Sequence, residues 1–269
     1  MVPGMSEAIE SRLRPLLVPS VTDVREDSLT GIQVTLLAAQ EEEARALGIH
    51  FEGGPELTIA VTDPARRLGQ VRVQTGGRRN TIFFDNRSWG GNFYAAIRIA
   101  GDDSFMMFNQ IGDEYVHLPD IYLRTGQQFL FWGTGASAVS CSLELDGQGQ
   151  GMVIGDDALI SDGVWIRNYD MHAMHDLLTG RRINRSPIDT VIERHVWVGQ
   201  DALLLSCERV GMGSIIGARA LVKGSIPARV VAAGTPARVI REGVSWGRHP
   251  YSMSPAERVS IGLPEQPEA

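Results

Sequence analysis

The chain has 269 residues, of which 43% are hydrophobic and 21% are charged, and this balance excludes an intrinsically disordered protein. The formal net charge of −7 argues against a nucleic-acid binder, which needs a basic face to displace counterions. The sequence has no apolar run long enough to span a membrane and no signal-peptide pattern, so it predicts a soluble, cytoplasmic protein.

The first predicted element is a short helix within an N-terminal segment, residues 1–50. The stretch LLAAQEEEARALG, from Leu36 to Gly48, combines good helix formers with a terminal glycine. This pattern is typical of a helix that ends at a glycine C-cap.

Residues 51–150 contain glycine turns that are flanked on both sides by apolar strands. The turn glycines follow one another at intervals of 21 to 25 residues, at Gly53, Gly76, Gly101, Gly126 and Gly147. We interpret these segments as irregular coils of a solenoid, in which loops lengthen each coil. The alternative is a separate antiparallel β domain stacked on the solenoid.

Residues 151–241 show a six-residue period. Aliphatic side chains recur at Ile192, Val198, Leu204, Val210, Ile216 and Val222, and a shorter run at Ile154, Ile160 and Ile166 is out of phase with them. A helix needs apolar residues three and four apart, and a half-buried strand needs alternation. A period of six with small residues at the corners instead fits an all-β parallel β-helix with triangular coils. The phase break predicts an inserted loop at about residues 167–190.

The C-terminal tail, residues 242–269, is rich in proline and serine and is expected to hold one helical turn at SPAERV.

Three motifs between Leu143 and Arg241 resemble the hexapeptide-repeat acyltransferases. They are IRNYDMHAMHDLLTGRRIN, HVWVGQDALLL and GSIIGARALVKGSIPARVVAAGTPARVIR, and the resemblance covers a little over a third of the chain. The most similar branch comprises O-acetyltransferases of capsule, exopolysaccharide and lipopolysaccharide pathways. The resemblance implies a left-handed parallel β-helix, a homotrimer and acetyl-CoA as the donor. Thr235 departs from the asparagine usual in the family, and Cys207 with Glu208 replaces a Lys-Gly turn.

The resemblance also implies catalytic residues. His172, in the Asp-x-His loop, corresponds to the family's general base. A histidine suits that role because its pKa lies near neutrality. His175 is the local competitor for that role. Asp170 or Asp176 could orient the imidazole, and a loop-capping role is the alternative for each. Trp197 corresponds to the aromatic residue that the family packs beside the thioester and the acceptor.

Further residues resemble the family's contacts to acetyl-CoA. The backbone amides around Gly217 and Ala218 correspond to contacts with the pantetheine arm, and Ser206 is a weaker candidate of the same kind. The cations that would meet the CoA phosphates are Lys223, Arg238 and Arg241.

Direct acetyl transfer to a hydroxyl of a sugar or polysaccharide precursor is the expected reaction, without a metal. Cys141 and Cys207 lie in no context that lowers a thiol pKa, which disfavours a covalent acetyl-enzyme. The alternative acceptors are an antibiotic or a serine-like small molecule.

Two other functions compete with acetyl transfer. One is a non-catalytic β-helix scaffold. The other is a zinc lyase of the carbonic-anhydrase type that would use His172, His175 and His195, although their spacing does not match that family's histidine pair.

Overall fold

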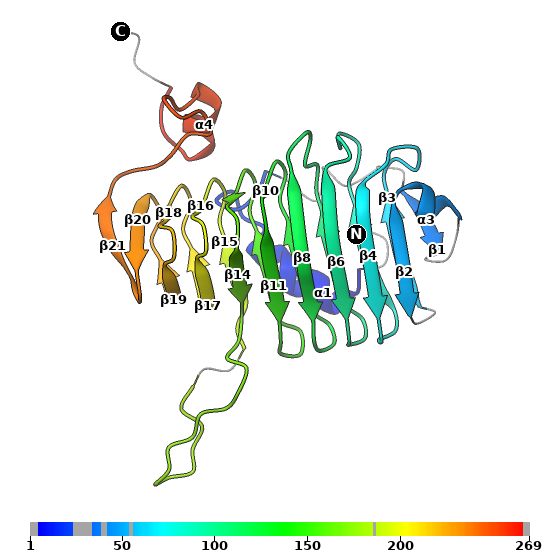
Figure 1. The fold of residues 1–269 in the computed structure, drawn as a ribbon, viewed down its shortest axis with the longest axis horizontal. Coiled ribbons are helices and arrows are strands. Elements are labelled where there is room, and N and C mark those ends of the chain that lie inside the picture. The colour runs from blue at the N-terminus through cyan, green and yellow to red at the C-terminus, as the bar shows by residue number, and fades with distance from the viewer. Residues whose placement is uncertain (1–4, 24–33, 39–41, 54–55, 185–186, 266–269) are drawn as a thin grey trace.

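The chain folds into a parallel β-helix whose coils stack along one axis (Figure 1). This computed structural model describes residues 5–23, 34–38, 42–53, 56–184 and 187–265. The predicted left-handed parallel β-helix is confirmed, with irregular N-terminal coils that pair in parallel with the regular ones. A separate antiparallel β domain in residues 51–150 is therefore excluded. The division of the chain at residues 50, 150 and 241 stays a prediction.

Each face of the β-helix is a ladder of strands from successive coils. The first face consists of β2 (Ile49–Gly53), β4 (Gly69–Thr75), β6 (Phe93–Ile99), β8 (Val116–Leu123), β11 (Cys141–Leu145), β14 (Val164–Arg167), β17 (Leu203–Val210) and β19 (Leu221–Ile226). The second consists of β3 (Leu57–Val61), β5 (Asn80–Phe84), β7 (Phe105–Phe108), β9 (Phe129–Trp132), β12 (Gly151–Ile154) and β15 (Thr190–Ile192), and continues into the ends of β17 and β19.

The third face has strands of its own in the later coils and continues into the beginnings of β8 and β6, where Ala138 pairs with Val116 and Val116 pairs with Phe93. It consists of β10 (Ser137–Ala138), β13 (Leu159–Ile160), β16 (Trp197–Val198), β18 (Ile215–Ile216) and β20 (Val230–Gly234), with β21 (Ala237–Glu242) antiparallel at its edge.

The N-terminal coils are wider than the C-terminal ones, and their core is correspondingly larger. Ile82 pairs with Met106, 24 residues along the chain, whereas Val198 pairs with Ile216, only 18 residues along. Buried aromatic rings fill the wide coils, as in the stack of Phe84 on Phe108 with ring centroids 5.3 Å apart. Aliphatic side chains alone suffice in the narrow coils, because less space lies between the three faces.

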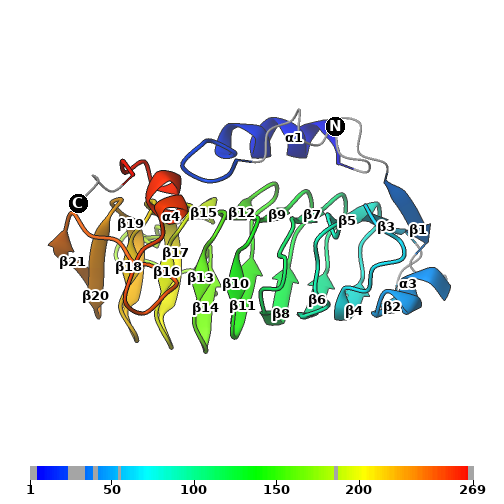
Figure 2. The ribbon, with the colours of Figure 1, turned by 90° about the horizontal axis from the view of Figure 1, so that it is seen from above.

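An N-terminal helix covers the outside of the second face (Figure 2). This helix, α1 (Glu7–Leu13), continues into a 3₁₀ turn, η1 (Arg14–Leu16). Ile9 and Leu13 are buried in a second apolar cluster with outward-facing residues of the strands, among them Phe83 and Phe105. The second face is therefore apolar on both of its sides.

The predicted helix from Leu36 to Gly48 is only partly correct. Residues Thr35–Ala38 form a strand, β1, which pairs antiparallel with β3, and the helix is confined to α3 (Glu42–Ala46). Residues 39–41 of that prediction lie outside the described ranges. Pairing with a neighbouring strand overrides the local helix preference here.

The predicted C-terminal helical turn is confirmed as α4 (Pro255–Ser260), which Ser254 and Glu257 close with a capping box. None of the helices within the described ranges is long and apolar enough to cross a membrane.

Candidate functional site

An inserted loop, residues 168–189, leaves the β-helix between β14 and β15 (Figure 1). Met152 pairs with Thr190, 38 residues along the chain, whereas Ile192 pairs with Val210, 18 residues along. The loop therefore adds about one coil's length of chain without adding a coil. An antiparallel bridge between His175 and Arg182 closes it into a hairpin, which projects beyond the strand ends.

Asp170 is the centre of a polar cluster at the base of this loop. Its Oδ1 accepts a hydrogen bond from the Ser206 hydroxyl at 3.5 Å and lies 3.5 Å from the Lys223 ammonium nitrogen. Its Oδ2 accepts from the Asn184 side-chain amide at 3.2 Å. We call these four residues the Asp170 cluster. The sequence predicts three of them, Asp170, Ser206 and Lys223, as site residues. All four line a hollow of about 290 Å³, together with Met174, Ile183 and Gly224.

Asn184 is the member of the cluster that sequence reasoning missed. Its amide nitrogen also donates to the backbone carbonyl of His172 at 2.9 Å. Its amide oxygen accepts from the Met174 backbone at 3.0 Å and from Arg182 Nε at 2.9 Å. Asn184 thus ties the two strands of the hairpin to each other and to Asp170. The motif that contains it was recognised, but nothing in the sequence distinguishes its side chain from a solvated one.

The ring of His172 is exposed on the loop, two residues from Asp170. Its competitor, His175, is engaged within the hairpin, where Nδ1 lies 3.1 Å from the Gly180 carbonyl oxygen. Asp176 caps the turn by accepting hydrogen bonds from the Thr179 and Leu178 backbones, and the Thr179 bonds hold its pKa below the ordinary value. The loop-capping alternative therefore describes Asp176. Asp170 instead contacts Asn184, Ser206 and Lys223 at the base of the loop, and its role toward the imidazole stays a prediction.

A second group of predicted residues lies on the third face, away from the Asp170 cluster. Trp197 on β16 is 37% exposed, and its indole nitrogen donates to the Ser161 hydroxyl at 3.2 Å. Gly217 and Ala218 follow the adjacent strand, β18. A Cβ on Gly217 would lie 2.9 Å from that of Ala233, so the coils approach closely here.

Arg238 and Arg241 complete this group, which we call the Trp197 corner. Both are exposed on β21, the terminal strand of the third face. The structure therefore splits the predicted acetyl-CoA contacts. Ser206 and Lys223 join Asp170, whereas the glycine, the alanine and the two arginines lie on the third face with Trp197.

His195 is fully buried and engaged in the fold. Its Nδ1 lies 2.5 Å from Asp157 Oδ2 and its Nε2 lies 2.8 Å from the Trp246 carbonyl oxygen, while its ring stacks on that of Trp246. These contacts attach the C-terminal segment to the β-helix. A zinc site made of His172, His175 and His195 is not formed, and no cluster of metal-binding side chains occurs within the described ranges.

Both cysteines are buried and form no disulfide. Burial raises the pKa of Cys207 to about 12 and raises that of Cys141 further. Neither thiol is therefore a nucleophile at neutral pH.

Comparison with known proteins relates the chain to sugar acetyltransferases, although no family model matches its sequence. It is 32% identical over 137 residues to a galactoside O-acetyltransferase of Lactococcus lactis, covering 51% of this chain and 64% of that protein. It is 35% identical over 100 residues to the galactoside O-acetyltransferase of Escherichia coli K12, covering 37% of this chain and 48% of that protein. The chain thus covers less than two thirds of the length of either relative.

A solved structure shares the fold over a longer range. The polysialic acid O-acetyltransferase OatWY superposes with a TM-score of 0.60 at 21% identity, over 80% of this chain and 94% of that one. The similarity therefore includes irregular coils that lie outside the recognised motifs.

Proposed function

We propose that the chain is an acetyl-CoA-dependent O-acetyltransferase that acts on a hydroxyl of a sugar or polysaccharide precursor, with His172 as the general base. The observation that carries this proposal is the Asp170 cluster, which holds the histidine-bearing loop in place beside a polar hollow. The names of the sequence relatives support the reaction class and the sugar acceptor.

The chemistry needs one base and no covalent enzyme intermediate. His172 takes the proton of the acceptor hydroxyl as its oxygen attacks the thioester carbon of acetyl-CoA. The tetrahedral intermediate then collapses, the carbon–sulfur bond breaks, and the thiolate of CoA takes a proton back from the imidazolium. The raised pKa values of both buried thiols support direct transfer, because neither thiol can attack the thioester.

Asp170 acts on the base through its neighbours in this proposal. Its carboxylate bonds the Asn184 amide, and that amide bonds the backbone carbonyl of His172. The loop at His172 is therefore held by a chain of two hydrogen bonds. Ser206 and Lys223 fix the other oxygen of the carboxylate, so that the whole arrangement rests on the rigid strands β17 and β19.

We further propose that the chain assembles as a homotrimer with the site between subunits. His172 lies on the loop between the first and second faces, whereas Trp197 lies on the third face, so one chain alone does not bring them together. The tip of the loop carries Leu177 and Leu178, each 97% exposed. Adjacent exposed leucines on a projecting hairpin favour burial against a second copy. Within such a trimer, the loop of one subunit would face the Trp197 corner of the next.

Two free cysteines fit a reducing compartment, and we therefore propose that the enzyme works in the cytoplasm.

Acetyl transfer is tested by incubating the protein with acetyl-CoA and a panel of sugars while free thiol and acetylated product are measured. Thiol release that depends on a sugar supports the proposal, and its absence with every hydroxyl acceptor contradicts it.

The intersubunit site is tested by co-assembling inactive His172→Ala chains with inactive Trp197→Ala chains. Mixed trimers would contain one site with both native residues and regain part of the activity. Mixed assemblies without activity would contradict a shared site.

A further inference from the structure

The outer surface of the first face carries polar and aromatic side chains in continuous rows across its strands. The strand register aligns one row across six coils, namely Glu52, Gln74, Arg98, Tyr122, Glu144 and Arg167. Neighbouring members are one strand spacing, about 4.8 Å, apart. The row begins in the wide N-terminal coils and ends at β14, next to the loop that carries Asp170.

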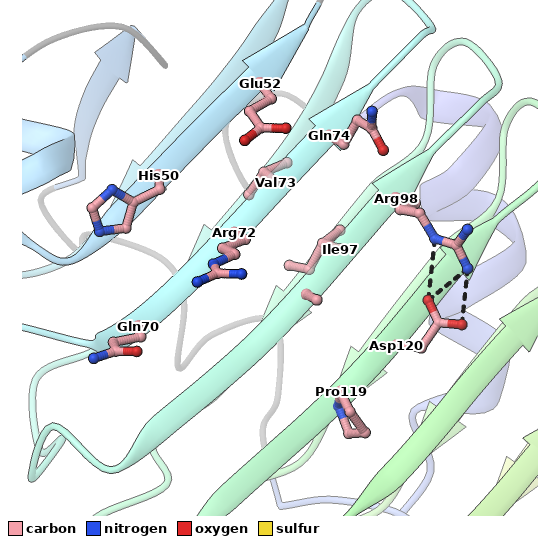
Figure 3. A pocket seen from close by; sticks show the side chains of 11 residues that line it. His50, Glu52, Gln70, Arg72, Val73, Gln74, Ile97, Arg98, Pro119 and Asp120 are labelled. Carbon is pink, nitrogen blue, oxygen red and sulfur yellow. Dashed lines mark hydrogen bonds and ion pairs between the residues drawn. The ribbon is translucent and has the colours of Figure 1, made fainter.

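Two adjoining hollows lie at the beginning of this row, and Figure 3 shows the larger one. The larger has a volume of about 630 Å³, and its lining includes Arg72 on β4, Arg98 on β6 and Asp120 on β8. The short side chain of Ala96 lies between longer neighbours and deepens it. The smaller hollow, of about 390 Å³, extends it to Tyr122.

A chain of arginine–aromatic contacts continues from the hollows toward the loop. The guanidinium carbons of Arg98 and Arg124 lie 4.4 and 4.9 Å from the centre of the Tyr122 ring. Arg124 also lies 5.7 Å from the ring centre of Tyr169, and Arg167 lies 5.6 Å from it. Tyr169 directly precedes Asp170, so these contacts lead to the Asp170 cluster.

The charges on this surface are only partly neutralised within the chain. Arg98 forms an ion pair with Asp120, and Arg167 forms one with Glu144. Within the described ranges, Arg72 and Arg124 form no ion pair, and the Arg124 guanidinium lies over the rings of Tyr122 and Tyr169. Glu52 is the acidic residue at the far end of the surface. Two available guanidinium groups are thus held in a chain whose net charge is −7.

We propose that this surface binds an acidic oligosaccharide and leads its hydroxyls to the Asp170 cluster, an inference that rests on the proposed acetyl transfer. A guanidinium group offers paired N–H donors that match a carboxylate, so Arg72 and Arg124 bind carboxylates on separate sugar units. Tyr115, which is 46% exposed and packs beside Tyr94, offers an aromatic surface to the apolar face of a sugar ring. Rows of side chains at a regular spacing suit a repeating polymer better than a compact small molecule.

The test compares oligogalacturonate and oligosialate with their methyl esters, which keep the sugar rings and remove the charge. Binding to the wild type is measured by titration calorimetry in the absence of acetyl-CoA. We expect at least one of the two acids to bind at least tenfold more tightly than its ester. Equal binding of acid and ester for both sugars, or no binding of either acid, would overturn the proposal.

The variant Arg72→Gln/Arg124→Gln should weaken binding of the acid at least tenfold and leave CoA binding unchanged. The control, Arg45→Gln, removes the same kind of charge from α3 and should leave binding unchanged. Equal effects of the two would overturn the assignment of these arginines. Carboxylate-specific binding without any acetyl transfer would instead overturn the proposed function and leave this surface as a saccharide site.

Discussion

Asn184→Ala is the substitution that most sharply separates positioning of the base from binding of the donor. The change removes the two bonds that the amide nitrogen donates, to Asp170 at 3.2 Å and to the His172 carbonyl at 2.9 Å. It also removes the two bonds that the amide oxygen accepts within the hairpin, from the Met174 backbone and from Arg182. At about 0.5–1.5 kcal/mol for each bond, the two donor bonds, which connect Asp170 to the backbone at His172, contribute about 1–3 kcal/mol. If that energy holds the base in position, kcat/KM for the acceptor falls roughly 5- to 150-fold.

The assay is steady-state thiol release, accompanied by a CoA titration and a thermal melt. We expect CoA affinity to stay within about twofold of the wild type and the melting temperature to move little, because Asn184 lies outside the apolar core. The control Asn92→Ala removes a 3.4 Å hydrogen bond to Asp113 in a distant coil loop and should leave turnover unchanged. Wild-type turnover in Asn184→Ala would refute the role of the Asp170 cluster in holding the loop.

Two further predictions follow from the pKa shifts. Cys141 and Cys207 should resist alkylation at pH 8 in the folded protein and react in denaturant, since burial raises both pKa values, and rapid labelling of native protein would contradict this. Burial alone would raise the pKa of Asp157, but its hydrogen bond to His195 and the Arg248 charge hold it below the ordinary 3.8. A carboxylate of this kind stabilises the fold above its unfolded pKa and loses that contribution as pH falls through the depressed folded value. Hydrogen exchange at residues 244–263 of the wild type should therefore stay slow from pH 7 to about 5. Only below pH 3.8 should the wild-type exchange rate rise steeply relative to that of Asp157→Asn. Equal protection in wild type and Asp157→Asn at pH 7 would contradict the attachment.

The repeats predicted the coils because each β-helix coil must present the same inward residues as the one before it. The glycine intervals of 21 to 25 residues correspond to coils of 22 to 24 residues, as in the pairing of Leu130 with Met152 and of Met106 with Leu130. The six-residue period likewise identified the narrow coils, where Val198 pairs with Ile216.

The N-terminal cover was missed because its apolar residues are few and widely spaced. Ile9, Leu13 and Val21 give no clear period on their own. The sequences of the strands beneath the cover do indicate that a cover is present. The runs FMMF and FLFW are apolar at every position, which indicates strands that are buried on both sides. Something outside the β-helix therefore had to cover them.

The sequence predicted Asp170, His172, Ser206 and Lys223 as functional residues, but it could not show which of them meet. Asp170 lies on the loop, and Ser206 and Lys223 lie on two successive coils. Their proximity depends on the strand register and on the bulge in β17 near Ser206. The separation of Trp197 from the Asp170 cluster has the same cause, because the two lie on different faces. Spacing along the chain carries no information about the face to which a loop turns.

Turnover of His172→Ala and His175→Ala at saturating acetyl-CoA, with a sugar acceptor, is the most decisive measurement of the proposed acetyl transfer. We expect that His172→Ala loses acetyl transfer and still binds CoA, whereas His175→Ala keeps most of its activity. Normal turnover in His172→Ala would contradict this expectation.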